Sequence, residues 1–143
     1  MTKLSQLLSA VLLNGLLLSS SALAMDNTVT GQWQTTDRFG QPESLVELFM
    51  EGDELRGRIV KLYDDTNQNA VCTECSDDRE GQPIVGLVFI TGLEADGEKW
   101  INGQVLDPES GSEYDCEVWR EGNTLKLKAG FGVFSQTKVW NRL

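Results

Sequence analysis

The chain has 143 residues, with 12 lysine and arginine residues against 22 aspartate and glutamate residues, and a formal net charge of -10 at pH 7. A surface this acidic repels the phosphates of nucleic acids and of anionic lipid headgroups, so the composition argues against nucleic-acid binding and against peripheral membrane binding. No histidine is present. Its absence excludes catalytic couples of serine or cysteine with histidine and removes the commonest metal ligand.

Residues 1–24 have the pattern of a cleavable signal peptide. Lys3 gives a basic start, residues 7–18 are apolar, and Ala22, Leu23 and Ala24 form a small-x-small cleavage site. The apolar stretch is shorter than the roughly 20 residues of a membrane-spanning helix. We therefore predict export to the periplasm of one domain, residues 25–143, without an integral membrane segment and with a net charge of 11 minus 22, or -11.

The predicted domain consists of short strands joined by tight polar turns. No window beyond the signal peptide shows a sustained helical period. One connection, residues 64–82, is much longer than the others. The eight expected strands cover residues 30–36, 43–50, 55–63, 83–93, 99–107, 112–120, 124–131 and 135–143.

Alternating residue types give these strands an inner and an outer face. Tyr114, Cys116 and Val118, for example, share one face of their strand, and acidic residues occupy the other. Because turns of two to five residues join antiparallel neighbours, the sequence predicts an all-β, mainly antiparallel fold. A sandwich or a barrel could bury the strands, and closure into a barrel leaves no exposed edge. An eight-stranded barrel is either filled by side chains or holds one small ligand.

The cysteines, Cys72 and Cys75 in the long connection and Cys116 in a strand, fit a structural disulfide best. A zinc site would need four ligands, and the carboxylates beside the close pair would raise the pKa values that a redox dithiol must lower. Loop entropy favours a bond to Cys116, worth about 4 kcal/mol against about 2 kcal/mol for the close pair. The inward position predicted for Cys116 instead suits a free buried thiol. The residues alone leave the pairing open.

The same connection carries oxygen-bearing side chains in the first, third and fifth places of an EF-hand loop (Asp65, Asn67 and Asn69). Ala70 stands where that loop needs glycine and Ser76 where it needs a bidentate glutamate, which excludes an EF-hand. A looser cation site that includes Asp77 or Asp78 remains an alternative to a solvated acidic loop. Motifs for a nucleophile elbow or a phosphate-binding loop are absent, so we expect no bound cofactor or metal, and catalysis by a pair of carboxylates stays the third and least favoured hypothesis.

Four segments together resemble an exported bacterial family, the domain of unknown function 2147. They are "GQWQTTD" from Gly31, "CTECSDDREGQPIVGL" from Cys72, "WINGQVLDPESGSEY" from Trp100 and "VWNR" from Val139. The resemblance implies a periplasmic protein with a lipocalin-like (calycin) barrel and a disulfide between Cys72 and Cys75, and it brings no catalytic residues. The family pattern has arginines where this chain has Lys128 and Gln136, so a role of those arginines does not carry over.

A second similarity is to lipocalins, which also begin with glycine-x-tryptophan and place an arginine late in the barrel. Gly31, Trp33 and Arg142 correspond to these positions. The indole would close one end of the barrel while the guanidinium lies over its face, a cation-π contact worth about 0.5 to 2 kcal/mol.

Aromatic residues are candidates for lining either a ligand cavity or the core: Phe49, Phe89, Trp100, Tyr114, Trp119 and Trp140. We therefore expect a non-catalytic binding module for a small apolar or amphipathic ligand. The alternative is a structural or interaction protein of the cell envelope, whose barrel is filled by side chains and takes no ligand.

Overall fold

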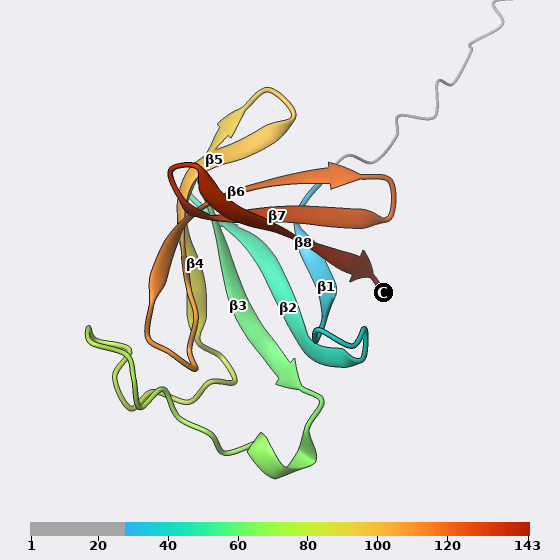
Figure 1. The fold of residues 1–143 in the computed structure, drawn as a ribbon. Helices are drawn as coiled ribbons and strands as arrows, with labels where there is room; N and C mark the ends of the chain where they lie inside the picture. Colours follow the sequence, from blue (N-terminus) through green and yellow to red (C-terminus); the bar gives the residue numbers. More distant parts are fainter. Residues whose placement is uncertain (1–27) are drawn as a thin grey trace, which may run out of the picture.

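A computed structural model describes residues 28–143, and the predicted signal peptide lies outside the described residues. The described part has eight strands and one short 3-10 helix (Figure 1). In chain order they are β1 (Gly31–Thr36), β2 (Pro42–Glu51), β3 (Glu54–Leu62), η1 (Asp65–Asn67), β4 (Val88–Asp96), β5 (Lys99–Leu106), β6 (Glu113–Glu121), β7 (Thr124–Phe131) and β8 (Phe134–Arg142). Within residues 28–143, no helix is long and apolar enough to cross a membrane.

The strands form a closed antiparallel barrel in which each strand pairs with the next and β8 pairs with β1. This confirms the predicted eight-stranded, all-β fold. The largest difference in a boundary concerns β4, which begins at Val88 rather than at residue 83. Gly86 takes a left-handed backbone conformation with φ 94°, and the Leu87 N–H donates to the carbonyl of Ile84. A tight turn therefore replaces the first part of the expected strand.

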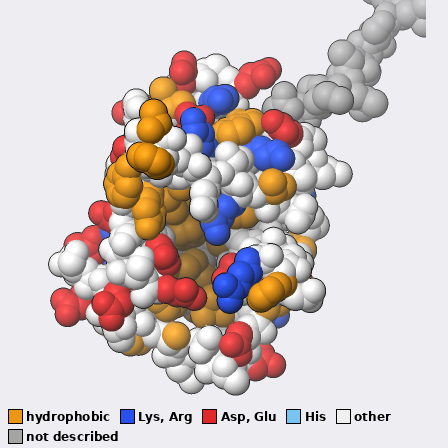
Figure 2. Space-filling model, in the orientation of Figure 1, with side chains coloured by type: hydrophobic (Ala, Val, Ile, Leu, Met, Phe, Trp, Pro, Cys, Tyr) orange, Lys and Arg blue, Asp and Glu red, His pale blue; other side chains and the backbone are white. Residues whose placement is uncertain are grey.

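The closure between β1 and β8 is short. Only two residue pairs join these strands, Trp33 with Arg142 and Gln34 with Asn141, whereas eight pairs join β7 and β8. Beyond the short seam the strands separate, and a cleft of about 680 Å³ lies between the β1–β2 turn and β8. The molecule is hollowed on this face (Figure 2). The barrel thus has one sealed end and one open end.

Trp33 seals the closed end. Its side chain is fully buried, and its indole Nε1 donates to the carbonyl of Val29 at 2.8 Å. The guanidinium carbon of Arg142 lies 4.7 Å from the ring centroid, and Arg142 Nη1 donates to the carbonyl of Thr30 at 2.8 Å. Gly31, with φ 109°, gives this guanidinium room, because a Cβ there would lie 3.0 Å from Arg142 Nη1. The closed end is thereby tied to the N-terminal segment as well as to β8.

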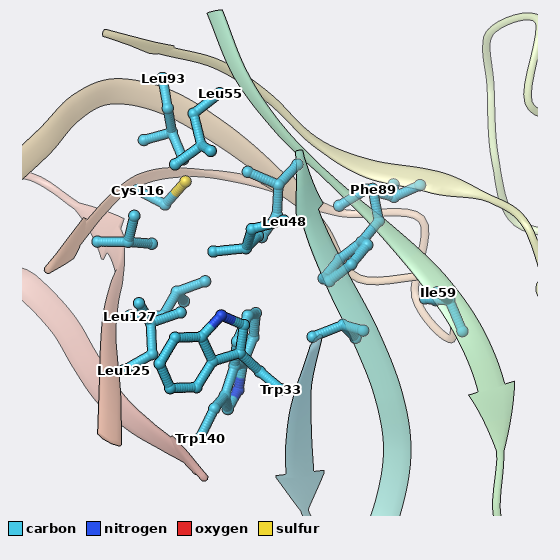
Figure 3. Packing of buried hydrophobic residues seen from close by; sticks show 14 of the residues in the cluster. Trp33, Leu48, Leu55, Ile59, Phe89, Leu93, Cys116, Leu125, Leu127 and Trp140 are labelled. Atoms are coloured by element: carbon cyan, nitrogen blue, oxygen red, sulfur yellow. The ribbon is translucent and has the colours of Figure 1, made fainter. Parts of the chain in front are cut away.

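Above the tryptophan, aliphatic side chains fill the closed half of the barrel (Figure 3). Close packing depends on Gly103 of β5, because a Cβ at that position would meet the side chain of Leu93 at 2.5 Å and the sulfur of Cys116 at 3.0 Å. The sulfur of Cys116 is therefore a packing atom of this core. Its fully buried members from β2, β3, β4, β6 and β7 are Val46, Leu48, Leu55, Ile90, Leu93, Val118 and Leu125.

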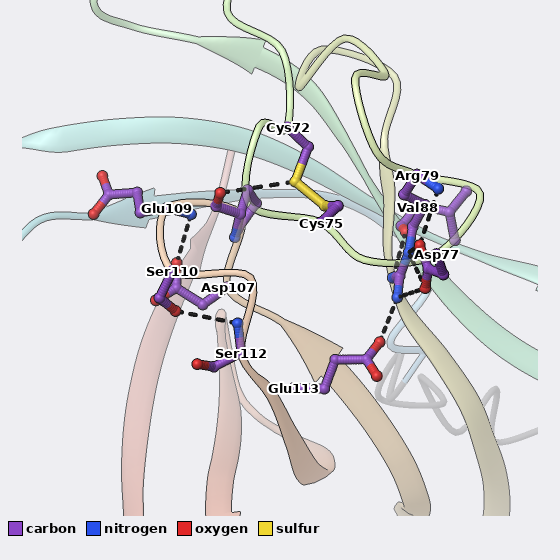
Figure 4. The surroundings of a disulfide bond; sticks show 11 residues. Cys72, Cys75, Asp77, Arg79, Val88, Asp107, Glu109, Ser110, Ser112 and Glu113 are labelled. Atoms are coloured by element: carbon purple, nitrogen blue, oxygen red, sulfur yellow. Dashed lines mark hydrogen bonds and ion pairs between the residues drawn. A yellow bond between two sulfur atoms is a disulfide. The ribbon is translucent and has the colours of Figure 1, made fainter.

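The long connection between β3 and β4 contains a disulfide between Cys72 and Cys75, with Cα atoms 5.5 Å apart. The predicted pairing is confirmed, and Cys116 is free and buried. The disulfide is itself buried (Figure 4). Backbone hydrogen bonds fold the loop back on itself, since the Cys72 N–H donates to the carbonyl of Gln82 and the Gly81 N–H to that of Cys72. The connection is thus a folded lobe whose buried disulfide belongs to the same hydrophobic cluster as the core of the barrel.

This lobe packs onto the turn between β5 and β6. A Cβ on Gly111 would lie 2.0 Å from the carbonyl oxygen of Glu74, so the two backbones approach closely. Near the other end of the lobe, Arg79 forms ion pairs with Asp77 and with Glu113 of β6. Hydrogen bonds and charge from Arg79 lower the pKa of Asp77 to about 2. Both contacts fix the lobe beside the open end of the barrel.

The Trp33 contacts predict the outcome of a conservative substitution. Trp33→Phe removes the indole N–H donor and leaves the carbonyl of Val29 without that hydrogen bond. The smaller phenyl ring also offers less aromatic surface to the guanidinium of Arg142. We expect the free energy of unfolding to fall by about 2 kcal/mol, measured by urea denaturation. Trp119→Phe is the control, because Trp119 lies on the outer face, and it should change stability by less than about 0.5 kcal/mol. Equal losses in the two variants would contradict the sealing role of Trp33.

The backbone approach at Gly111 predicts a second difference. Gly111 and Gly122 have similar left-handed conformations, φ 74° and 60°, but nothing lies within 4 Å of a Cβ at Gly122. Gly122→Ala should therefore cost only the conformational strain, about 1 kcal/mol. Gly111→Ala adds the clash with Glu74, and we expect it to destabilise the oxidised protein by at least about 2 kcal/mol more. Similar unfolding midpoints for the two variants would show that the lobe does not rest on this turn.

Candidate ligand-binding cavity

The open half of the barrel contains a cavity of about 1270 Å³. Its walls come from strands on all sides of the barrel and from the lobe between β3 and β4, which contributes Val71, Thr73 and Ile84. Drug-sized ligands occupy pockets of about 300 to 1,000 Å³. The volume is therefore sufficient for a small molecule, and the lobe forms part of the mouth.

Apolar side chains line the interior of this cavity. Within the barrel, Phe89 and Trp140 face each other with ring centroids 6.2 Å apart. Nearer the mouth, Tyr114 and Phe131 have centroids 5.1 Å apart. Figure 2 shows hydrophobic side chains in the floor of the hollow. The remaining apolar walls include Val46, Ile59, Leu62, Val105, Leu106, Leu127 and Ala129.

Two hydroxyl groups in the wall bond to each other. The Oγ atoms of Thr35 and Ser44 are 2.7 Å apart, and the Ser44 N–H donates to Thr35 Oγ1 at 3.1 Å. Both residues are buried. This bond uses one of the two hydroxyl protons, and the other hydroxyl proton of the pair can still be donated into the cavity.

Carboxylates dominate the charged groups that line the cavity, with five acidic side chains (Asp37, Glu43, Asp64, Asp107 and Glu109) against one basic side chain, Lys138. Three of the five accept hydrogen bonds from backbone N–H groups of their own turns, namely Asp37, Asp64 and Asp107. The carboxylates of Glu43 and Glu109, in contrast, accept no backbone hydrogen bond from the described residues. Burial raises the pKa of Glu43, and the ammonium group of Lys138 partly offsets this rise. The polar margin of the cavity is therefore acidic.

The structure separates the six aromatic candidates into three groups. Phe89, Tyr114 and Trp140 line the cavity. Trp100 is half-buried and packs against the core.

Phe49 and Trp119 lie on the outer face of the barrel, so their predicted lining role is wrong. Each neighbours an inward residue of its own strand, Leu48 or Val118, and successive side chains of a strand point to opposite faces. Cations cover both outer rings: the guanidinium of Arg58 lies 5.0 Å from the Phe49 centroid, and Lys99 Nζ lies 4.4 Å from that of Trp119.

Two residues of the cavity, Glu43 and Lys138, were not predicted from the sequence. Lys138 alternates with Gln136 and Trp140 on one face of β8, and this period of two could have placed it beside the predicted tryptophan. Glu43 gives no comparable signal, because it precedes the regular alternation of β2 and lies at the mouth through the shape of the β1–β2 turn.

Within residues 28–143, no group of three or more histidine, cysteine, aspartate or glutamate residues could hold a metal ion. The carboxylate of Asp77, considered above for a cation site, is engaged by Arg79. Burial and the neighbouring charges of Asp115 and Glu117 raise the pKa of Cys116 to about 12. The thiol is therefore protonated at neutral pH and is a poor nucleophile.

Comparisons with known proteins agree with this architecture. No curated protein matches the sequence. A solved structure similar to this chain is described as "Protein HP1028 from the human pathogen Helicobacter pylori belongs to the lipocalin family". The two share 18% sequence identity with a TM-score of 0.71, over 82% of this chain and 84% of that chain. At this identity the likeness shows a lipocalin-like fold and nothing further.

A family model matches residues 31–142, which span all eight strands. The matched range runs from Gly31, beneath the guanidinium at the closed end, to Arg142, which supplies that guanidinium. The chain therefore belongs to the family described as "Uncharacterized protein conserved in bacteria (DUF2147)".

Proposed function

We propose that this protein is a non-catalytic binding module that holds one small apolar or amphipathic molecule in the open half of its barrel. The observation that carries the proposal is the apolar cavity of about 1270 Å³, sealed below by a packed core and open at one end. Burial of apolar ligand surface in such a cavity is favourable at about 25 cal/mol per Å². The signal peptide predicted from the sequence supports a periplasmic location for this binding.

The alternative, an envelope interaction protein with a barrel filled by side chains, fits only the closed half. There the side chains of Leu48, Leu55 and Leu93 belong to one buried cluster that fills the interior. In the open half, Ala129 is a small residue facing the cavity, and Phe89 and Trp140 leave space between themselves and the mouth. The two halves of one barrel thus have different packing, and the unfilled half favours a ligand.

The charges of the cavity lining bear on the polar end of an amphipathic ligand. A carboxylate or sulfate headgroup would meet five acidic side chains and one lysine. A cationic or uncharged headgroup avoids this repulsion, and Glu43 could pair with a cation in a partly desolvated position where charges interact more strongly than in water. The proposed ligand is therefore neutral or positively charged at its polar end.

Filling the cavity should abolish binding. Ala129 faces the cavity, whereas its neighbour Lys128 is exposed on the opposite face of β7. We expect Ala129→Phe to weaken the binding of the uncharged dye Nile red by at least about tenfold, measured by fluorescence titration, because the added ring occupies the ligand volume. Lys128→Phe is the matched control and should retain the affinity of the original protein. No saturable dye binding by the original protein would refute the proposed function.

The headgroup preference has its own test, with three surfactants of equal alkyl chain below their micelle concentrations. We expect the trimethylammonium form to bind most tightly, the maltoside less tightly and the sulfate least, by calorimetry. Glu43→Gln should reduce the advantage of the cation, whereas Glu98→Gln, in the turn at the closed end, should not.

The pH dependence of that advantage follows from Glu43. Because its pKa is raised, the advantage should be complete above that pKa and should decline as the pH falls through it. If the sulfate form bound most tightly, the proposed headgroup preference would be wrong, but the proposal that the cavity binds an amphipathic molecule would stand.

A further inference from the structure

The β7–β8 hairpin differs in charge from the rest of the chain. Residues 124–142 contain four basic residues (Lys126, Lys128, Lys138 and Arg142) and no aspartate or glutamate. Because the whole chain has a net charge of -10, the remainder carries -14 and this hairpin +4. Arg142 lies over Trp33 at the closed end, and Lys126 forms an ion pair with Glu121. Lys128 is exposed on the outer face of β7 toward the tip, whereas Lys138 is exposed at the cavity margin near Glu43.

The tip of this hairpin exposes three large apolar side chains. Phe131, Val133 and Phe134 are 57%, 91% and 83% exposed. Gly132, with φ 53°, makes the turn between them. Isolated exposed hydrophobic residues are ordinary, but three within four positions at one convex tip are a feature that needs an account.

The tip is continuous with the mouth of the cavity. Phe131, Val133 and Phe134 belong to the residues that line the cavity. Figure 2 shows hydrophobic side chains gathered beside the hollow and continuing into its floor. An apolar path therefore runs from the most exposed side chains of the hairpin to the interior of the barrel.

We propose that the tip of the β7–β8 hairpin docks on a lipid bilayer that contains anionic headgroups. Phe131, Val133 and Phe134 enter the boundary between headgroups and acyl chains, and Lys128, on the outer face of β7, contacts lipid phosphates. Interfacial binding of this kind strengthens with the apolar area that is buried and with the attraction of basic residues to anionic lipids. A stable protein interface, in contrast, needs about 800 Å² on each partner, and three side chains at a convex tip offer much less.

The net acidity of the chain, which taken alone argues against peripheral membrane binding, limits the orientation but leaves a contact through the basic β7–β8 hairpin open. At physiological ionic strength, charges are screened beyond about 8 Å, so the carboxylates of the closed end have little influence at the tip. Asp37, Glu43 and Glu109 lie at the cavity and would repel an anionic surface brought flat against the mouth. The hairpin therefore meets the bilayer tip first, with the acidic margin kept away from the headgroups.

Docking in this orientation would place the cavity mouth beside a reservoir of apolar and amphipathic molecules. This consequence rests on the proposed binding function, but the docking itself does not, because it requires no ligand in the cavity. Vesicle binding and dye binding are thus separate measurements, and either can fail without the other.

Flotation with extruded vesicles tests the proposal on the predicted domain, residues 25–143. Vesicles of phosphatidylcholine alone should recover little protein, and vesicles with equal parts of phosphatidylcholine and phosphatidylglycerol should recover most of it. We expect the double variant Val133→Ser/Phe134→Ser to reduce the partition coefficient by at least about tenfold, and Lys128→Gln to reduce it severalfold only on the anionic vesicles.

Two matched controls make these results specific. Met50→Ser removes an apolar residue that is 42% exposed beside the β2–β3 turn at the closed end, and Lys61→Gln removes an exposed lysine on β3. Both should leave the partition coefficient unchanged. Absence of vesicle binding, equal effects in the controls, or a tip variant that changes only the oligomeric state in light scattering would overturn the proposal. The last result would assign the tip to contact with a second copy of the chain.

Discussion

The shape of the molecule depends on how briefly β1 and β8 meet. Two residue pairs close the ring of strands, and both lie beside Trp33, whose ring carries the guanidinium of Arg142. Where that plug sits, the strands are held together and the interior is filled. Beyond it no further residue pair joins β8 to β1 in the described part of the chain, and the interior opens between these strands. The local arrangement of the Trp33 indole, the Arg142 guanidinium and Gly31 is thus associated with both the packed core at the closed end and the open cavity beyond it.

The sequence predicted the barrel well because its strongest signals are local. Alternation placed Cys116 and Val118 inside, and short turns implied antiparallel neighbours. The pairing of Cys72 with Cys75 came from family resemblance, because loop entropy alone favoured the longer bond. The start of β4 was misplaced, since Ile84 and Val85 have the composition of a strand while the backbone at Gly86 turns away.

The candidate site was less predictable, for physical reasons. Residue type alone predicts that an aromatic side chain lines the cavity, yet the face of the strand decides its role, and Phe49 and Trp119 are one position away from the inward-facing residues Leu48 and Val118. The alternation of inward and outward residues within each strand could have excluded Phe49 and Trp119 from the predicted cavity lining. The cavity depends on distances between strands that are remote in sequence, and the acidic margin depends on turns. A period within one strand cannot give either of these.

Export to an oxidising compartment, as proposed above, would make the pairing of three cysteines ambiguous, and the fold resolves the ambiguity through distance along the chain. Cys72 and Cys75 are separated by two residues, so their thiols meet often while the chain is still unfolded, whereas Cys116 is a distant competitor. Once β6 has joined the sheet, Cys116 is enclosed against Gly103 and its thiol stays protonated. The unpaired sulfur is thus removed from exchange by the same packing that completes the core. A chain that reaches its barrel with the short bridge already made leaves no thiolate exposed for scrambling.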